Sequence, residues 1–298
     1  MSETSTQSPH RLLLVGIDGV RLDMLTRIPT PALDRVTASG FLATPLVDPR
    51  NITVSGPMWA TVLSGLWSDE HGVVCNERPP DDGIHAPDFL SRILQRQPDS
   101  KLFAAVSWAP LASRAGCGPL INPETAECFV ADCGSETVDD YIRADAAVEE
   151  YSVRRLADEP VRAAFVYFGE ADEACHEFGM GDEYETAIRR CDAHLGKLLN
   201  AIEARPDSDE WIVIVTTDHG HVDAGGHGGD SLVERQVWIA CSEPSLEYEL
   251  RDSATIASVA VRVTTGSRAA WPAGQSAMAC SDSSPLTPSV PASRARRS

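Results

Sequence analysis

The 298-residue sequence has no apolar run that approaches the roughly 20 residues needed to cross a lipid bilayer. Its first ten residues, MSETSTQSPH, also lack the basic start and the apolar stretch of a secretory signal. We therefore expect a cytoplasmic location and no membrane partner.

Positive charge and closely spaced cysteines are also scarce. There are 25 Lys and Arg residues against 44 Asp and Glu residues, a formal net charge of −19. This charge repels polyanions and argues against a nucleic-acid polymer as a partner, whereas a small phosphorylated substrate stays compatible because bound divalent cations reverse the field locally. The eight cysteines form no CxxC pair, so we expect reduced thiols.

Apolar runs at residues 11–17, 103–107, 163–168 and 211–216 predict buried strands. Helical signals alternate with them at residues 31–39, 61–66 and 184–204, where apolar residues recur at helical spacing. This alternation predicts an α/β fold with one catalytic unit.

The ends and the middle of the chain differ in character from these elements. Residues 1–10 and the Ser-, Pro- and Ala-rich residues 267–298 predict disordered ends around a domain at 11–266. Residues 76–151 show no regular alternation of predicted strands and helices. We expect them to form a partly inserted cap region that shapes the substrate pocket.

Three of the predicted strands are followed by an aspartate, namely Asp18, Asp172 and Asp218. Ligands gather at the carboxyl ends of parallel strands, so these carboxylates can converge although they lie far apart in sequence. A single aspartate at such a place is as often a cap or turn residue. Three together, two of them accompanied by histidine, favour a metal site.

The accompanying histidines have specific positions. His176 follows Asp172 by four residues, His219 follows Asp218 directly, and His227 lies in the loop GGHGG. Aspartate and histidine without thiolates suit zinc, with manganese as the next candidate, and there are enough ligands for two divalent ions. The alternative for His227 is a flexible surface loop.

Ser55 lies in the stretch NITVSGPMWAT, just before a predicted helix. A helix amino terminus favours a phosphoryl group because its free N–H groups and its dipole point at the negative charge. Alone, a serine there is most often a cap. Beside a metal ion its alkoxide becomes accessible near neutral pH, which makes Ser55 a candidate nucleophile.

The ordered motifs VGIDG, TVSGPMWATVLSG, SDEHGV, D-x-x-x-H and TTDHGH, over residues 11–245, resemble the alkaline phosphatase superfamily and its nucleotide pyrophosphatase/phosphodiesterase-like branch. The resemblance implies a mostly parallel sheet with helices on both faces, and a phosphoserine intermediate. It also implies two zinc ions: one, bound by Asp18, Asp218 and His219, activates Ser55, which is itself a ligand, and the other is bound by Asp172, His176 and His227.

The sequence departs from this branch at two places. The usual nucleophile is a threonine followed by Phe-Pro-Asn-His, whereas Ser55 is followed by Gly-Pro-Met-Trp, and Asn51 or Asn76 are the candidates to replace the missing asparagine. Many members place the third metal-binding histidine far downstream, but no histidine follows His227, and His221 is a less favoured alternative.

The remaining histidines and aromatic residues have simpler interpretations. His71, in the SDEHGV motif, matches a position that we interpret as structural. We expect surface or packing roles for His10, His85 and His194. Trp59, Trp108 and Phe129 are candidates for a pocket around a second phosphate substituent, although each is more often a core residue.

The leading functional hypothesis is metal-dependent hydrolysis of a small phosphodiester or nucleotide pyrophosphate. A phosphomonoesterase is the first alternative, and a catalytically silent metal-binding scaffold is the second. A sulfatase is disfavoured because the Ser-x-Pro-x-Arg context lacks its arginine here. Phosphoglycerate mutase-like transfer uses the same metals and serine, but the chain is short for that enzyme's two domains.

Overall fold

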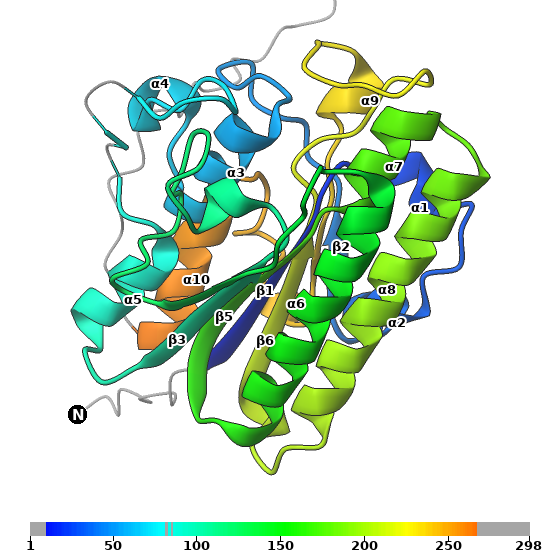
Figure 1. The fold of residues 1–298 in the computed structure, drawn as a ribbon. Helices are drawn as coiled ribbons and strands as arrows, with labels where there is room; N and C mark the ends of the chain where they lie inside the picture. The colour runs from blue at the N-terminus through cyan, green and yellow to red at the C-terminus, as the bar shows by residue number, and fades with distance from the viewer. Residues whose placement is uncertain (1–9, 81–82, 85, 267–298) are drawn as a thin grey trace, which may run out of the picture.

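The computed structural model describes residues 10–80, 83–84 and 86–266. The predicted disordered segments at 1–9 and 267–298 lie outside these described residues. A seven-stranded sheet of order β2-β7-β6-β1-β5-β3-β4 runs through the centre (Figure 1). Its strands are β1 (Arg11–Ile17), β2 (Phe41–Ala43), β3 (Lys101–Val106), β4 (Glu127–Val130), β5 (Val161–Phe168), β6 (Trp211–Thr216) and β7 (Ile239–Cys241).

Strands β6, β1, β5, β3 and β4 pair in parallel, and β7 is antiparallel to both of its neighbours. The predicted α/β class and mostly parallel sheet are therefore confirmed. The helices are α1 (Leu22–Leu25), α2 (Pro31–Ser39), α3 (Ser55–Ser64), α4 (Ser68–His71), α5 (Phe89–Arg96), α6 (Val138–Asp158), α7 (Glu170–Phe178), α8 (Asp182–Glu203), α9 (Leu232–Arg235) and α10 (Thr255–Thr265), with short 3-10 turns η1 (Ala109–Leu111), η2 (Ser208–Glu210) and η3 (Pro244–Leu246).

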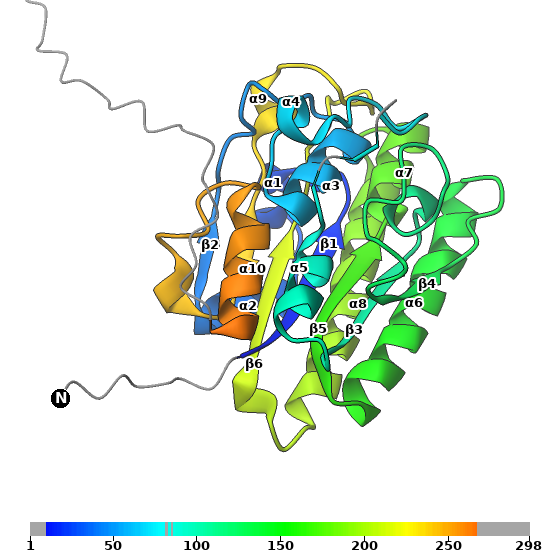
Figure 2. The same cartoon turned by 90° about the vertical axis from the view of Figure 1, so that its left-hand side faces the viewer.

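Helices cover both faces of the sheet, with α2, α6 and α8 on one side and α3, α5 and α10 on the other (Figures 1 and 2). Strand β1 lies between them and is buried on both faces. Leu13 and Val15 join the core under α6 and α8, while Leu12 and Leu14 join the core under α3 and α10. A strand buried on both faces needs a continuous apolar run, which is the pattern found in its sequence.

The expected cap at residues 76–151 is corrected for most of its length. This segment supplies β3, β4, α5 and most of α6, which belong to the sheet and its two helical layers. The strand predicted at 103–107 corresponds to β3, whereas β4 and α5 are short elements in Pro- and Gly-rich surroundings and were not predicted. Among the described residues, no helix combines the length and apolarity needed to span a membrane.

The strand order brings together the predicted acidic strand ends. β1 pairs with β5 on one side and with β6 on the other, so all three end at the same edge of the sheet. The nucleophile helix α3, the short helices α4 and α9, and α7 lie at this edge (Figures 1 and 2).

Candidate active site

The first group of candidate metal ligands consists of Asp18, Asp218 and His219 at the ends of β1 and β6. His219 Nε2 lies 3.2 Å from Asp218 Oδ2 and 3.5 Å from Asp18 Oδ1. The Oγ atom of Ser55 lies 3.3 Å from the same His219 nitrogen. All four residues are buried. The structure thus places the candidate nucleophile beside the ligands that the sequence assigned to the first ion.

Ser55 is the first residue of α3, and Val54 before it is extended. The amide of the next residue, Gly56, donates to Asn76 Oδ1 over 2.7 Å, so the Asn76 side chain adjoins the nucleophile. Asn51 points elsewhere, because its amide donates to Thr61 and its carbonyl oxygen accepts from the Ser68 amide and hydroxyl. Of the two asparagines considered from the sequence, Asn76 is therefore the one at the nucleophile.

Two aromatic side chains hold the other oxygen of Asp18. Trp59 Nε1 donates to Asp18 Oδ2 over 2.8 Å, and the hydroxyl of Tyr167 donates to the same atom. Trp59 is fully buried, so of its two interpretations the structure favours the core position, from which it orients a carboxylate. The contribution of Tyr167 was missed, because a tyrosine near the end of an apolar strand carries no sequence signal for such a contact.

The second group consists of Asp172 and His176 from α7 and His227 from the glycine-rich loop. The i, i+4 spacing puts Asp172 and His176 on one helix face, with Asp172 Oδ2 3.4 Å from His176 Nε2. His227 Nε2 lies 2.9 Å from His176 Nε2 and 3.7 Å from Asp172 Oδ1. The structure therefore brings together all three residues of the predicted second set.

Hydrogen bonds to Nδ1 assign the ring protons of the histidines. Nδ1 of His227 faces the carbonyl oxygen of Thr53 at 2.7 Å, and Nδ1 of His219 faces that of Gly220 at 3.2 Å. A carbonyl only accepts, so both Nδ1 atoms carry hydrogen and both Nε2 atoms offer a lone pair to the site. Burial lowers the pKa of both rings, which keeps them neutral and able to bind a metal.

His221, the less favoured ligand in the sequence, is fully buried within the site. Its Nδ1 accepts a hydrogen bond from the Gly226 amide, so its hydrogen is on Nε2, 2.8 Å from Asp172 Oδ1. This geometry suits a donor that orients Asp172 better than a metal ligand. Gly19 leaves room for it, because a Cβ there would lie 2.5 Å from His221 Nε2.

The electrostatics of both groups fit divalent cations. One buried oxygen of Asp18 and one of Asp218 have no hydrogen-bond partner. Burial and then the Asp172 charge raise the pKa of Asp18 to about 7, and burial, Asp18 and Asp172 raise that of Asp218. A cation would compensate this repulsion and satisfy the free oxygens. Asp18, Asp218 and His219 form one possible metal-binding group, and Asp172, His176 and His227 form another.

The remaining candidates lie outside the two groups. His71 is buried beside α3, where it contacts the Thr61 hydroxyl at 3.1 Å and accepts a hydrogen bond from the Val73 amide, a structural position. His194 is a packing residue, stacked on Phe168. The backbone amide of His10 bonds to α10 through Val263, and His85 lies outside the described residues.

The aromatic candidates separate in the same way. Phe129 stacks on Tyr151 at the outer strand β4, with ring centroids 4.5 Å apart, so it serves packing there. Trp108 follows the carboxyl end of β3 and is half-buried, so it stays a candidate for the substrate pocket.

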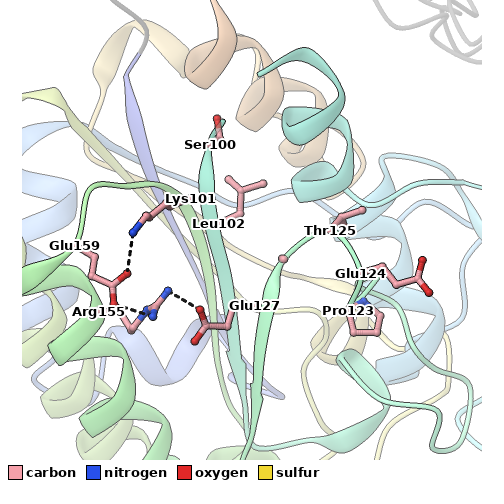
Figure 3. A pocket seen from close by; sticks show the side chains of 10 residues that line it. Ser100, Lys101, Leu102, Pro123, Glu124, Thr125, Glu127, Arg155 and Glu159 are labelled. Atoms are coloured by element: carbon pink, nitrogen blue, oxygen red, sulfur yellow. Dashed lines mark ion pairs between the residues drawn. The ribbon is translucent and has the colours of Figure 1, made fainter. Parts of the chain in front are cut away.

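An open pocket of 540 Å³ lies at the opposite end of the sheet, where β3, β4 and β5 begin (Figure 3). Four of its charged side chains, those of Lys101, Glu127, Arg155 and Glu159, form ion pairs with one another. Arg155 contacts Glu127 at 2.8 Å and Glu159 at 2.7 Å, and Lys101 lies 3.9 Å from Glu159. This pocket therefore lacks the unpartnered ligand atoms found at the carboxyl edge.

Comparison with known proteins identifies the family. The family described as Type I phosphodiesterase / nucleotide pyrophosphatase matches residues 12–280, and the chain belongs to it. It is 24% identical over 83% of its length to rat "Ectonucleotide pyrophosphatase/phosphodiesterase family member 7" and 23% identical over 87% to bovine "Bis(5'-adenosyl)-triphosphatase ENPP4". These alignments cover 57% and 56% of the relatives, so the chain spans little more than half the length of the relatives it matches.

A solved structure supports the same fold. An inactive murine ectonucleotide pyrophosphatase / phosphodiesterase 5 in complex with AMP superposes with a TM-score of 0.52 at 20% identity, covering 71% of this chain and 57% of that chain. The structure thus shares the fold of this relative, and the family match over residues 12–280 confirms the recognised superfamily branch.

Proposed function

We propose that this protein hydrolyses a small phosphodiester or a nucleotide pyrophosphate through a phosphoserine at Ser55, with two divalent cations, zinc first and manganese second. The observation that carries the proposal is the position of Ser55 Oγ, 3.3 Å from His219 Nε2 within the first ligand group. Asp172, His176 and His227 form the second group beside it, joined to the first by the stacked rings of His219 and His227, whose centroids are 3.7 Å apart.

The chain's own residues account for binding, attack and orientation. Bound cations would supply fixed positive charge for the phosphoryl oxygens and lower the pKa of the serine hydroxyl. Ser55 Oγ attacks phosphorus, and the bond to the leaving oxygen breaks as the serine–phosphorus bond forms. Water then cleaves the phosphoserine and restores the hydroxyl. The Gly56 amide holds Asn76 Oδ1 next to Ser55, and in this proposal the amide nitrogen of the same side chain donates to a non-bridging oxygen.

The charges around the site favour a diester over a monoester. Among the described residues, the ion pairs of Asp18, Asp172 and Asp218 all involve histidine and none involves Lys or Arg. A monoesterase usually supplies an extra positive group for the additional charge of its substrate. The names of the rat and bovine relatives point in the same direction. A phosphomonoesterase stays the second candidate.

The test compares a diester, a monoester and nucleotide substrates. Zinc-loaded protein is assayed on bis-p-nitrophenyl phosphate, p-nitrophenyl phosphate, thymidine 5'-p-nitrophenyl phosphate and diadenosine triphosphate, beside Ser55→Ala and EDTA-treated samples. Serine- and metal-dependent preference for the diesters or the triphosphate supports the proposal. Preference for the monoester selects the phosphatase, and zinc binding without turnover of any substrate selects the silent scaffold.

The phosphoserine has its own test. Rapid quenching in acid during turnover, followed by peptide mass spectrometry, should find phosphate on Ser55. A steady-state reaction in which no phosphorylated Ser55 accumulates at any quench time or pH would favour direct attack by water. The cytoplasmic location stays a prediction, which cell fractionation in the source organism would check.

A further inference from the structure

Thr53 connects the nucleophile segment to the loop that carries His227. Its side chain is fully buried, and its hydroxyl donates to the Gly229 carbonyl over 2.9 Å and accepts from the Gly228 amide over 3.0 Å. Its own carbonyl oxygen faces Nδ1 of His227 at 2.7 Å. One residue therefore contacts three consecutive residues of this loop.

The loop needs such an external support. Gly228 has a φ of +104°, a conformation that L side chains rarely adopt, and the flanking glycines have no side chains to pack. Glu234 holds the far side by accepting from the Gly229 amide over 2.7 Å. Thr53 holds the near side, next to the imidazole of His227.

The same contacts reach the nucleophile. Val54 is extended, so the side chains before and after it, Thr53 and Ser55, point to the same side of the segment. The hydroxyl of Ser55 meets His219, while Thr53 meets the His227 loop. The segment 53–55 thus touches both candidate ligand groups.

We propose that Thr53 is a positioning residue that sets the affinity of the second cation by orienting His227. Thr53 would thereby also fix the position of this cation relative to Ser55. The inference rests on the proposed two-cation function. The Thr53 carbonyl selects the tautomer whose Nε2 can bind a metal, and the hydroxyl fixes the loop so that this nitrogen points at Asp172 and His176.

The experiment measures zinc affinity rather than activity alone. Full-length wild type, Thr53→Val, Thr53→Ser and Thr264→Val are titrated with zinc in competition with a chromophoric chelator, and urea unfolding of the zinc-free proteins records stability. Valine removes the hydroxyl at nearly constant shape and serine retains it. Thr264 is the matched control, because its buried hydroxyl donates to the Ala260 carbonyl within α10, away from the ligands.

We expect Thr53→Val to weaken the binding of the second zinc ion about 10- to 100-fold and to leave that of the first unchanged, because the hydroxyl contacts that fix the loop carrying His227 are lost. Thr53→Ser and Thr264→Val should bind both ions as wild type does. If Thr53→Val does not fold, Thr53→Ala removes the same hydroxyl with less crowding and carries the same expectation.

Second-ion affinity in Thr53→Val within twofold of wild type would overturn the inference, as would an equal loss in Thr264→Val. Both results presuppose a wild type that binds two zinc ions, and they leave the proposed function intact. A wild type that binds fewer than two ions overturns the two-cation proposal and the inference with it.

Discussion

The two ends of the sheet use the same kinds of charged residues in opposite ways. At the end where strands begin, Arg155 pairs with Glu127 and Glu159 in an open pocket. At the end where strands finish, Asp18 and Asp218 face each other and a histidine, with buried oxygens that have no hydrogen-bond partner.

Burying a carboxylate without a partner is unfavourable, so a fold retains such a group only where something else stabilises it. This difference indicates that the carboxyl edge, rather than the end where the strands begin, is suited to bind a ligand. At the paired end the charges of Arg155, Glu127 and Glu159 balance one another, whereas at the carboxyl edge bound cations would supply the missing positive charge.

We expect the largest effect at the carboxyl edge from removal of the proposed nucleophile, Ser55. Ser55→Ala should lower kcat/KM for the best diester roughly a thousandfold or more, because the attacking oxygen is lost. Ser64→Ala is the control in the same helix, since the Ser64 hydroxyl donates to the Ala60 carbonyl and accepts from the Leu66 amide, and neither partner is a candidate ligand. Equal activity in Ser55→Ala and wild type would exclude Ser55 as the nucleophile.

Chelation tests the carboxyl edge directly. Treatment with EDTA should abolish turnover, and zinc at 100 times its dissociation constant should stabilise the fold by about 2.7 kcal/mol, because it binds the native site. Differential scanning calorimetry with and without zinc measures the shift. A melting temperature independent of zinc would mean that the crowded carboxylates are not a metal site.

Asp218→Asn should separate stability from affinity. The amide removes one of the crowded charges, so the zinc-free variant should be at least as stable as wild type in urea, while zinc affinity falls at least about 100-fold. Asp192→Asn is the contrasting control, because both Asp192 oxygens accept backbone amides, at Ala32 and Leu33. Because Asp192→Asn loses one acceptor oxygen, its free energy of unfolding should fall by about 1 kcal/mol. Destabilisation of both variants alike would contradict the comparison.

Asp145 supports the second group from behind. This fully buried carboxylate of α6 accepts the amides of Gly169 and Glu170 and so caps α7, which has no side-chain cap of its own. Asp145→Ala should lower the free energy of unfolding by about 1–3 kcal/mol. Asp139 lies in the same helix and is exposed, so Asp139→Ala should change the free energy of unfolding by less than about 0.5 kcal/mol. Urea titration distinguishes them, and equal values would argue against the cap.

Substitutions at the end of the sheet where the strands begin should change activity and zinc affinity least. Glu127→Gln weakens a partly exposed ion pair with Arg155, which is worth at most about 1 kcal/mol. Activity and zinc affinity should equal those of wild type. A large loss of turnover in this variant would link the pocket of Figure 3 to the chemistry and remove the contrast between the two ends.

Much of the candidate site at the carboxyl edge could be predicted from the sequence, because the motifs that form it are local. An apolar run followed by aspartate predicts a buried strand with a carboxylate at its end, and the D-x-x-x-H spacing puts two ligands on one helix face whatever surrounds it. The motifs therefore predicted Ser55, the three aspartates and the three histidines as site candidates, and the structure brings these side chains together, while their roles stay predictions.

Tertiary structure alone decided the supporting contacts. Trp59 and Tyr167 reach Asp18 because β1 lies against β5 and α3, Asn76 reaches the nucleophile through the Gly56 amide, and Thr53 meets the His227 loop 174 residues away. The sequence predicted the strand at 103–107 but did not show that it belongs to the same sheet as β4 and the same layers as α5 and α6, since that depends on contacts with distant segments. Hydrogen bonds and packing between segments far apart in the chain follow from the topology of the sheet, which no local pattern encodes.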